Sequence, residues 1–389
     1  MSSGKDYNRY VKWVRCIVAI VICLTVITVV VLSAKSRING NKNSEPTTEY
    51  SENSVIPEED EEAYDLPPRV LNSDVVPYDG QRRAISCWGD SMMFGIGAGE
   101  AYVSGSDEVL DISGWTTPDT LEVYNLGVSG ETSNEIALRQ GGIKMYVDNT
   151  FEVGYDDSVE VSIVDEYGNP VYMADFSAYG YVEPHEPDVV YINDDMFKIT
   201  GTEETGLYIC RYSETEVGGD AFTTVYKGTQ VTTKASYERK GDILILEIGS
   251  NGGWDNYRQL ISQYDAMIQN AGCDYYIIVG DTDDPGTSIA DTSQGFCNED
   301  GTYIGVGDTA WEATLSEAYG EHFINMRTYL IENGLSDAGL RATNADYRGF
   351  RRGRISKQLR SDWTHFNSYG YYAKGLAIYE KGVELGYWK

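Results

Sequence analysis

The sequence predicts an α/β fold in which helices cover both faces of a parallel sheet in three layers, with an all-β insertion and an N-terminal transmembrane helix. Three patterns predict this architecture. An uncharged, apolar stretch runs from Cys16 to Ala34. Apolar strands alternate with amphipathic helices over residues 81–146 and again over 240–389. Between these parts, over 147–239, short alternating strands are separated by Gly, Asn and Asp turns.

The apolar stretch 16–34 is long enough to form a membrane anchor. At about 1.5 Å per residue it crosses a hydrocarbon core of about 30 Å. Four basic residues precede it and favour a cytoplasmic tail over residues 1–15: Lys5, Arg9, Lys12 and Arg15. The alternative is a cleaved signal peptide ending near Ser33. We expect a single-pass protein of the cell membrane whose folded part lies outside the cell.

A polar segment over residues 35–80 follows the apolar stretch. It contains the acidic run Glu58–Glu62 and the pair Pro67-Pro68. Such a composition buries too little apolar surface to offset its ordering entropy, so we expect a flexible acidic stalk. The whole chain has a formal net charge of −31. This charge argues against nucleic acid as a partner, because nucleic acid phosphates would be repelled.

Each element of the predicted α/β part has a local signal. The strand Ala84–Trp88 runs into Gly89-Asp90-Ser91, and a second strand, Leu121–Tyr124, precedes a helix that begins at Thr132 or Ser133 and stops at Gly141. Asp242–Ile248 is nearly all apolar, as in a strand that is buried on both faces. The same rhythm predicts the helices Asn256–Asn270, Trp311–Tyr319, Met326–Glu332 and Tyr369–Leu385, and the strands Tyr275–Val279 and Phe323–Asn325.

Three short segments carry residues suited to nucleophilic catalysis. Ser91 follows a predicted strand directly, and Asn251 in Gly249-Ser250-Asn251 does so after another. Asp362 and His365 are three residues apart, so the carboxylate can accept from the imidazole Nδ1–H and leave Nε2 to take a proton from serine. Asn251 could donate to a developing oxyanion.

Together with a fourth segment, Asn125 to Thr132, these segments resemble in their order the blocks of the SGNH (GDSL-like) hydrolase family. The resemblance covers residues 81–146 and 240–389. The blocks are Gly89-Asp90-Ser91, Asn125 to Thr132, Gly249 to Asn251 and Asp362 to His365. The resemblance implies a flavodoxin-like α/β/α fold with Ser91, His365 and Asp362 as a catalytic triad. It also implies an oxyanion hole formed by Ser91, Gly130 and Asn251. Two positions depart from the family pattern: Met92 replaces a common Leu, and Gly252 replaces a common Asp.

The resemblance implies an extracellular serine esterase that removes acetyl or other small acyl groups, most plausibly from carbohydrate. The expected partner is an acylated carbohydrate or a small ester, and neither a metal nor an organic cofactor is implied. One alternative is an O-acyltransferase acting on a cell-wall polymer, in which a sugar hydroxyl replaces water. Another is a glycan-binding surface protein without catalysis.

A basic segment precedes the last block. Arg351 and Arg352 are its centre, and Arg348, Arg354, Lys357 and Arg360 flank them. One interpretation is a solvated loop partly paired with carboxylates; the other is a binding site that guides an anionic polymer to Ser91. The tyrosines of the insertion either fill its strands or contact a glycan. We expect structural or surface roles for His185 and His322.

Overall fold

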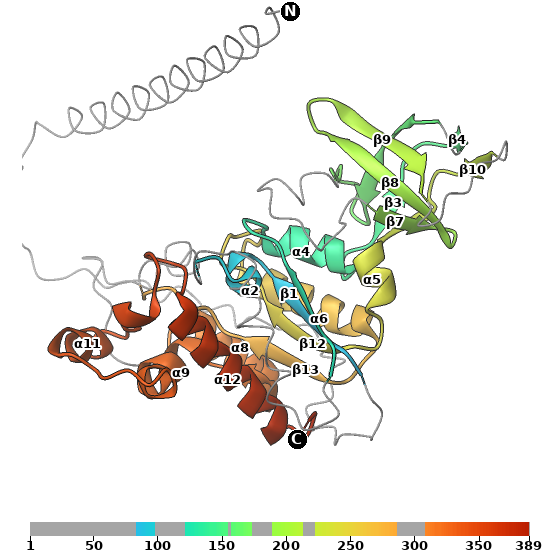
Figure 1. Cartoon of the computed structure of the whole chain (residues 1–389). Helices are drawn as coiled ribbons and strands as arrows, with labels where there is room; N and C mark the ends of the chain where they lie inside the picture. The colour runs from blue at the N-terminus through green and yellow to red at the C-terminus, as the bar shows by residue number, and fades with distance from the viewer. Residues whose placement is uncertain are drawn as a thin grey trace, which may run out of the picture. The chain divides into compact units, whose positions relative to one another are not determined.

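The computed structural model describes residues 83–97, 121–154, 157–172, 189–212, 222–285 and 308–388 (Figure 1). The predicted cytoplasmic tail, anchor and stalk lie outside these residues.

A parallel sheet forms the centre of the α/β part. Its strands follow the order β14-β13-β12-β1-β2. They are β1 (Ile85–Gly89), β2 (Val123–Gly127), β12 (Ile243–Glu247), β13 (Tyr276–Val279) and β14 (Phe323–Ile324). Because β1 continues to β2 on one side and β12 lies on its other side, the direction of winding reverses between β1 and β12. In open α/β sheets, ligands bind at such a reversal, at the carboxyl ends of the strands.

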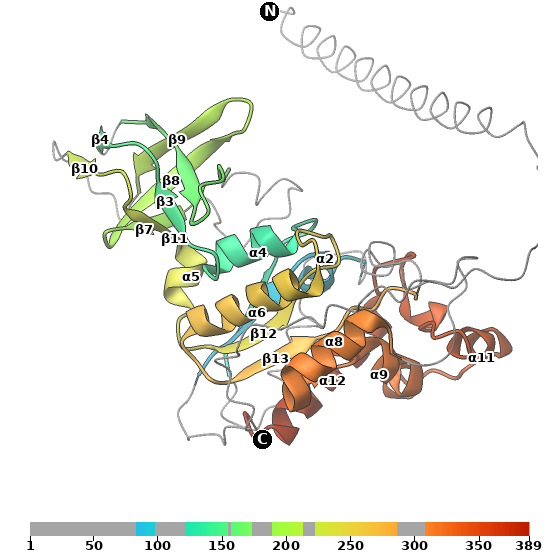
Figure 2. The same ribbon diagram turned by 180° about the vertical axis from the view of Figure 1, so that it is seen from behind.

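Helices cover both faces of this sheet. On one face lie α4 (Ser133–Gln140), α6 (Tyr257–Ala271) and α8 (Ala310–Tyr319), whose apolar side chains cluster with Trp88 and Leu246 (Figure 2). On the other lie α9 (Met326–Glu332) and α12 (Ser368–Glu384), which cluster with Cys87 and Ile245. Successive residues of a strand point to opposite faces, so each strand contributes to both clusters. The short helices α10 (Gly334–Asp337) and α11 (Asn344–Phe350) follow α9.

A second, antiparallel sheet of seven strands is formed by residues 145–233. Its order is β5-β9-β8-β7-β11-β3-β6. The strands β5 (Val159–Val161) and β6 (Ile163–Asp165) lie at opposite edges although only one residue separates them, so the sheet curls nearly into a barrel. The others are β3 (Met145–Val147), β7 (Val189–Ile192), β8 (Asp195–Thr202), β9 (Gly206–Arg211) and β11 (Gln230–Thr233). Beside them, β4 (Phe151–Val153) pairs with β10 (Thr223–Val225).

The chain enters and leaves the antiparallel sheet beside one residue, Asn270, near the end of α6. Its amide nitrogen donates to the carbonyl of Gln140, at the end of α4, at 2.7 Å. Its amide oxygen accepts from Lys144 on the way in and from Lys240 on the way out, each at 2.6 Å. The return passes through the short helix α5 (Lys234–Glu238). Both junctions are therefore fixed to the same helix.

The fold class predicted from the sequence is wrong as a description of this architecture. The chain is not a simple three-layer sandwich, because residues 145–233 build a separate antiparallel sheet with more strands than the parallel one. Short strands joined by tight turns pair with their neighbours, as at the two-residue turn Asn193-Asp194, where φ is 53° and 67°. Within the part of the chain that the structure covers, no helix is long and apolar enough to cross a membrane. The predicted transmembrane helix, 16–34, lies outside that part.

Candidate active site

Ser91 lies where β1 turns sharply into the four-residue helix α2 (Ser91–Phe94). The turn leaves no room for a side chain at position 89: a Cβ on Gly89 would lie 2.7 Å from the carbonyl oxygen of Glu247 on the neighbouring strand. Asp90 caps α2 by accepting from the Met92 N–H at 2.9 Å. The turn therefore places Ser91 at the carboxyl end of the sheet, next to the reversal between β1 and β12.

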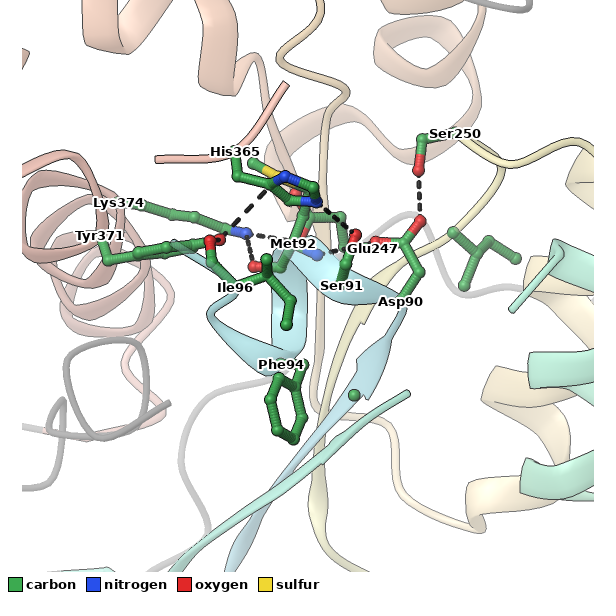
Figure 3. Close-up of polar contacts among 12 residues, drawn as sticks. Asp90, Ser91, Met92, Phe94, Ile96, Glu247, Ser250, His365, Tyr371 and Lys374 are labelled. Atoms are coloured by element: carbon green, nitrogen blue, oxygen red, sulfur yellow. Dashed lines mark hydrogen bonds and ion pairs between the residues drawn. The ribbon is translucent and has the colours of Figure 1, made fainter. Parts of the chain in front are cut away.

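The structure joins Ser91, His365 and Asp362 in one chain of hydrogen bonds. Figure 3 shows the part of this chain between His365 and Ser91. The Nε2 atom of His365 lies 3.0 Å from Ser91 Oγ, and its Nδ1 atom lies 2.8 Å from Asp362 Oδ2. Ser91 and His365 are 274 positions apart in the chain. The three predicted triad residues are thus brought together in the order serine, imidazole, carboxylate.

The hydrogen bonds of Asp362 determine which ring nitrogen of His365 carries the proton. Asp362 Oδ1 accepts from the N–H groups of Thr364 at 2.8 Å and His365 at 2.7 Å. Partial burial alone would raise the pKa of Asp362, but these hydrogen bonds and the one from His365 outweigh it and lower the pKa. An ionised carboxylate only accepts, so Nδ1 of His365 carries the proton and Nε2 accepts from Ser91.

Asp90 connects the serine turn to the loop after β12. Its Oδ2 atom accepts from the Ser250 hydroxyl in a short contact (Figure 3). The same atom accepts from the Asn251 amide at 3.1 Å. Burial raises the pKa of Asp90, although the hydrogen bonds from Ser250 and Met92 act in the opposite direction. Sequence reasoning treated Asp90 only as part of a motif, whereas the structure makes it the residue that holds Asn251 beside the nucleophile.

The three predicted oxyanion donors differ in whether their N–H groups already have a hydrogen-bond acceptor. Within the described ranges, the N–H groups of Ser91 and Gly130 have no hydrogen-bond acceptor. Asn251 Nδ2 donates to Asp90 Oδ2 and to the carbonyl of Glu131, both at 3.1 Å. Both of its protons are therefore used, and an oxyanion would have to replace one of these acceptors.

A buried ion pair supports the loop that carries Gly130. Arg139 of α4 contacts Glu131 at 2.6 Å and donates to the carbonyl of Leu126 at 2.7 Å. The facing loop is fixed by Gly252, whose carbonyl accepts from the Ser133 N–H at 2.9 Å. Gly252 has φ of 82°, a conformation that glycine adopts without strain. A glycine at position 252 therefore suits a backbone conformation that other residues rarely adopt.

Below the serine turn lies a second buried ion pair that the sequence did not reveal. Lys374 of α12 donates to Glu247 Oε2 at 2.5 Å and to the Met92 carbonyl at 2.8 Å (Figure 3). Next to it, the Tyr371 hydroxyl donates to the Ile96 carbonyl at 2.7 Å. The helix α12 thus holds both the start and the end of the α2 turn. The lysine was not predictable, because nothing in its local sequence distinguishes it from a surface lysine.

Arg360 secures the loop that carries Asp362 and His365. Its guanidinium donates to the carbonyls of Thr364 at 2.7 Å and Thr282 at 2.6 Å, and only 6% of its side chain is exposed. The sequence placed Arg360 with the basic segment, but its contacts make it a link between the triad loop and the loop after β13. In that loop, burial raises the pKa of Asp283 to about 6, against the attraction of Arg360.

The remaining sequence predictions have different outcomes. Arg351 and Arg352 lie at the end of α11 and are exposed, and no contact between them and Ser91 is seen. His322 is not on the surface as expected: it is 2% exposed and its ring stacks on Tyr276 at 4.1 Å. His185 lies outside the described residues.

No protein family model, no curated protein and no solved structure matches this chain. The site must therefore be interpreted from its own geometry.

Proposed function

We propose that the protein is a serine esterase of the SGNH hydrolase type. The observation that carries this proposal is the continuous relay from Asp362 through His365 to Ser91, with both hydrogen bonds at 3.0 Å or less. A serine is a weak nucleophile unless an adjacent base takes its proton, and this relay supplies such a base. A glycan-binding protein without catalysis would have no need for it.

Acylation begins when Ser91 Oγ attacks the ester carbonyl carbon and its proton moves to His365 Nε2. Asp362 stabilises the imidazolium through the hydrogen bond at Nδ1. The tetrahedral intermediate then collapses: the bond to the alcohol oxygen breaks, and His365 returns its proton to the leaving alcohol. The acyl group remains on Ser91 as an ester.

Deacylation follows the same steps, with water as the nucleophile. His365 takes a proton from water as the water oxygen attacks the acyl carbon, and the bond to Ser91 Oγ breaks as the proton returns to the serine. The products are a carboxylic acid and the free enzyme. In both steps the negative oxygen would lie near the N–H groups of Ser91 and Gly130, and Asn251 would exchange one of its present acceptors for it.

The substrate class that fits best is a small acyl ester, such as an acetyl group, on a carbohydrate. Support comes from the resemblance of the four sequence blocks to SGNH hydrolases. A sugar hydroxyl could replace water in deacylation without any change in the residues used. Product analysis with and without an acceptor sugar therefore separates hydrolysis from acyl transfer.

The first test is hydrolysis of p-nitrophenyl acetate by the full-length protein, its Ser91→Ala variant and its Asn251→Ala variant. We expect the serine variant to fall to the background rate and the asparagine variant to lose about 10²–10³ in kcat. Ser250→Ala is the matched control, because Ser250 also donates to Asp90 but has no oxyanion role. Its rate should stay within about tenfold of the wild type.

Thermal unfolding of each variant excludes a loss of structure as the cause. Equal activity of the Ser91→Ala variant and the wild type would overturn the esterase proposal. Near-normal kcat in Asn251→Ala would remove only Asn251 from the mechanism.

A further inference from the structure

A cluster of exposed cations lies just before the loop of Asp362 and His365 in this acidic protein. Residues 341–360 contain seven cationic side chains and a single carboxylate, in a chain with a net charge of −31. We define the basic patch as the five of these cations that are exposed and have no carboxylate within ion-pair distance among the described residues: Arg341, Arg348, Arg351, Arg352 and Lys357. In so acidic a chain, surface cations would be expected to find partners.

The carboxylate within this segment is already occupied. Asp346 accepts from the Thr343 hydroxyl at 2.6 Å, the Ser356 hydroxyl at 2.7 Å and the Gln358 amide at 2.9 Å. Burial tends to raise the pKa of Asp346, but these hydrogen bonds prevail and lower it. Asp346 therefore acts as an ionised anchor for the backbone and forms no ion pair with the patch.

The backbone beneath the patch is held firmly. Arg327 donates to the carbonyl of Gly353 at 2.8 Å, and it is itself paired with Glu312 at 2.5 Å in the protein interior. The bonds of Asp346 join α11 to Ser356 and Gln358, and the Arg327 contact ties the turn between them to α9. A fixed backbone presents the guanidinium groups at a constant spacing.

The spacing of the arginines brings like charges together. Arg348, Arg351 and Arg352 are three and four residues apart, and backbone bonds from Arg351 to Tyr347 and from Arg352 to Gly349 continue the helical turn. Like charges at this spacing on a helix repel one another and destabilise it. The helix dipole favours cations at this end but does not require three of them. An anionic ligand would offset the repulsion.

The patch is connected to the triad loop. Arg354, which follows Arg352 by two residues, lies 3.6 Å from Asp284 Oδ2, and Arg360 lies 3.8 Å from Asp284 Oδ1. Arg360 also donates to Thr364, the neighbour of His365. Arg354, which adjoins the patch in the chain, is thus linked to the loop of His365 through Asp284 and Arg360. In both views α11 lies beside α9 at the edge of the α/β part (Figures 1 and 2).

We propose that the basic patch binds an anionic carbohydrate polymer and delivers its acyl esters to Ser91. This inference rests on the esterase function proposed above. Guanidinium groups bind carboxylate and phosphate groups in paired, directed hydrogen bonds, so acidic sugars suit the arginines. The Debye length is about 8 Å at physiological salt, so the patch attracts locally while the acidic remainder of the surface repels. An acidic polymer would therefore be held at this edge and not elsewhere.

The binding test uses the full-length Ser91→Ala variant, which cannot consume the ligand. The probe is polygalacturonate, with dextran as the neutral polymer, measured at 50 mM and 200 mM salt. We expect polygalacturonate to bind, to weaken with salt, and to lose about tenfold or more in affinity in Arg351→Glu/Arg352→Glu. Arg258→Glu is the matched control, since Arg258 is an exposed arginine on α6, and it should bind like the parent.

The turnover test uses the same charge reversal in the active protein. We expect kcat/KM on acetylated polygalacturonate to fall about tenfold, while acetylated dextran and p-nitrophenyl acetate are hydrolysed as before. Arg351→Gln/Arg352→Gln should give an intermediate loss. Equal losses on charged and neutral esters would overturn the proposal, as would unchanged binding of polygalacturonate.

Two further outcomes are distinguishable. If no ester is hydrolysed but polygalacturonate still binds through the patch, the esterase function fails and the binding surface stands. If the patch variants instead lose binding to phosphatidylserine vesicles and polygalacturonate never binds, the surface belongs to a membrane and the polymer proposal is overturned.

Discussion

Arg360 ties the catalytic loop to the sheet without touching the triad atoms. Because it donates to the Thr364 and Thr282 carbonyls, Arg360→Ala would let His365 move relative to Ser91. A displacement of about 1 Å can cost about 10²-fold in rate. We expect a loss of kcat of that order on p-nitrophenyl acetate with little change in KM, and partial recovery in Arg360→Lys.

The control for this prediction is Arg354→Ala. Arg354 shares the Asp284 contact but is about half exposed and lies outside the triad loop. Its kcat on the neutral ester should be normal. If the two variants behave alike, Asp284 and not the carbonyl contacts of Arg360 would hold the loop.

At the residue scale, the sequence reveals groups whose role is local. Asp362 and His365 are predictable because three-residue spacing in one loop brings a carboxylate to an imidazole. Other residues act through contacts with residues far away in the chain, as Asp90, Lys374 and Arg360 do. Such contacts cannot be predicted from a local sequence pattern.

The buried pair between α12 and β12 holds two elements together. Lys374 is fully buried and Glu247 is 8% exposed at its side chain. Lys374→Met would leave the carboxylate buried without a partner, which costs about 3–5 kcal/mol. We expect the urea midpoint of unfolding to fall accordingly and to recover in Lys374→Met/Glu247→Leu.

Lys381→Met serves as the comparison within the same helix. Its partner Glu384 is 63% exposed, and exposed pairs contribute about 0–1 kcal/mol. A similar loss in both variants would show that α12 tolerates methionine poorly, independent of the buried pair.

Element prediction succeeded where apolar periodicity was strong. The helix Met326–Glu332 was predicted with the bounds that the structure has, and α6 is displaced by one residue at each end. The helix α11 was missed because Asn344–Phe350 has no apolar stripe and depends on the cap formed by Thr343 and Asp346.

At the scale of the whole molecule, buried carboxylates determine how stability changes with pH. Burial raises the pKa of Asp242 from 3.8 to about 6, against the attraction of Arg239. Between about pH 4 and 6 the folded protein therefore binds more protons at this site than the unfolded chain, so its contribution to stability falls as pH rises. The loss amounts to at most about 3 kcal/mol.

Asp242→Asn should remove this contribution. We expect the variant to gain unfolding free energy relative to the wild type as urea titrations move from pH 4.5 to 7. Asp274→Asn, at an exposed aspartate, should run parallel to the wild type. Parallel curves for Asp242→Asn as well would show that Asp242 is ionised throughout in the folded protein.

The architecture as a whole was less predictable than its parts. Gly, Asn and Asp turns indicated short strands over 147–239, but strand pairing depends on contacts between distant segments. The pairing of β3 with both β11 and β6 closes a seven-stranded sheet that no single segment encodes. The size of this sheet is what makes the simple sandwich description fail.

Asn270 brings the two ends of the inserted sheet close together, which affects how the insertion can change during evolution. Because its one side chain holds both the entry at Lys144 and the exit at Lys240, the two cut points of the antiparallel sheet are neighbours in space. A descendant could lengthen, shorten or exchange everything between them and still close the gap with a short connection. The α/β part that carries Ser91, His365 and Asp362 could then stay unchanged while the inserted sheet varied.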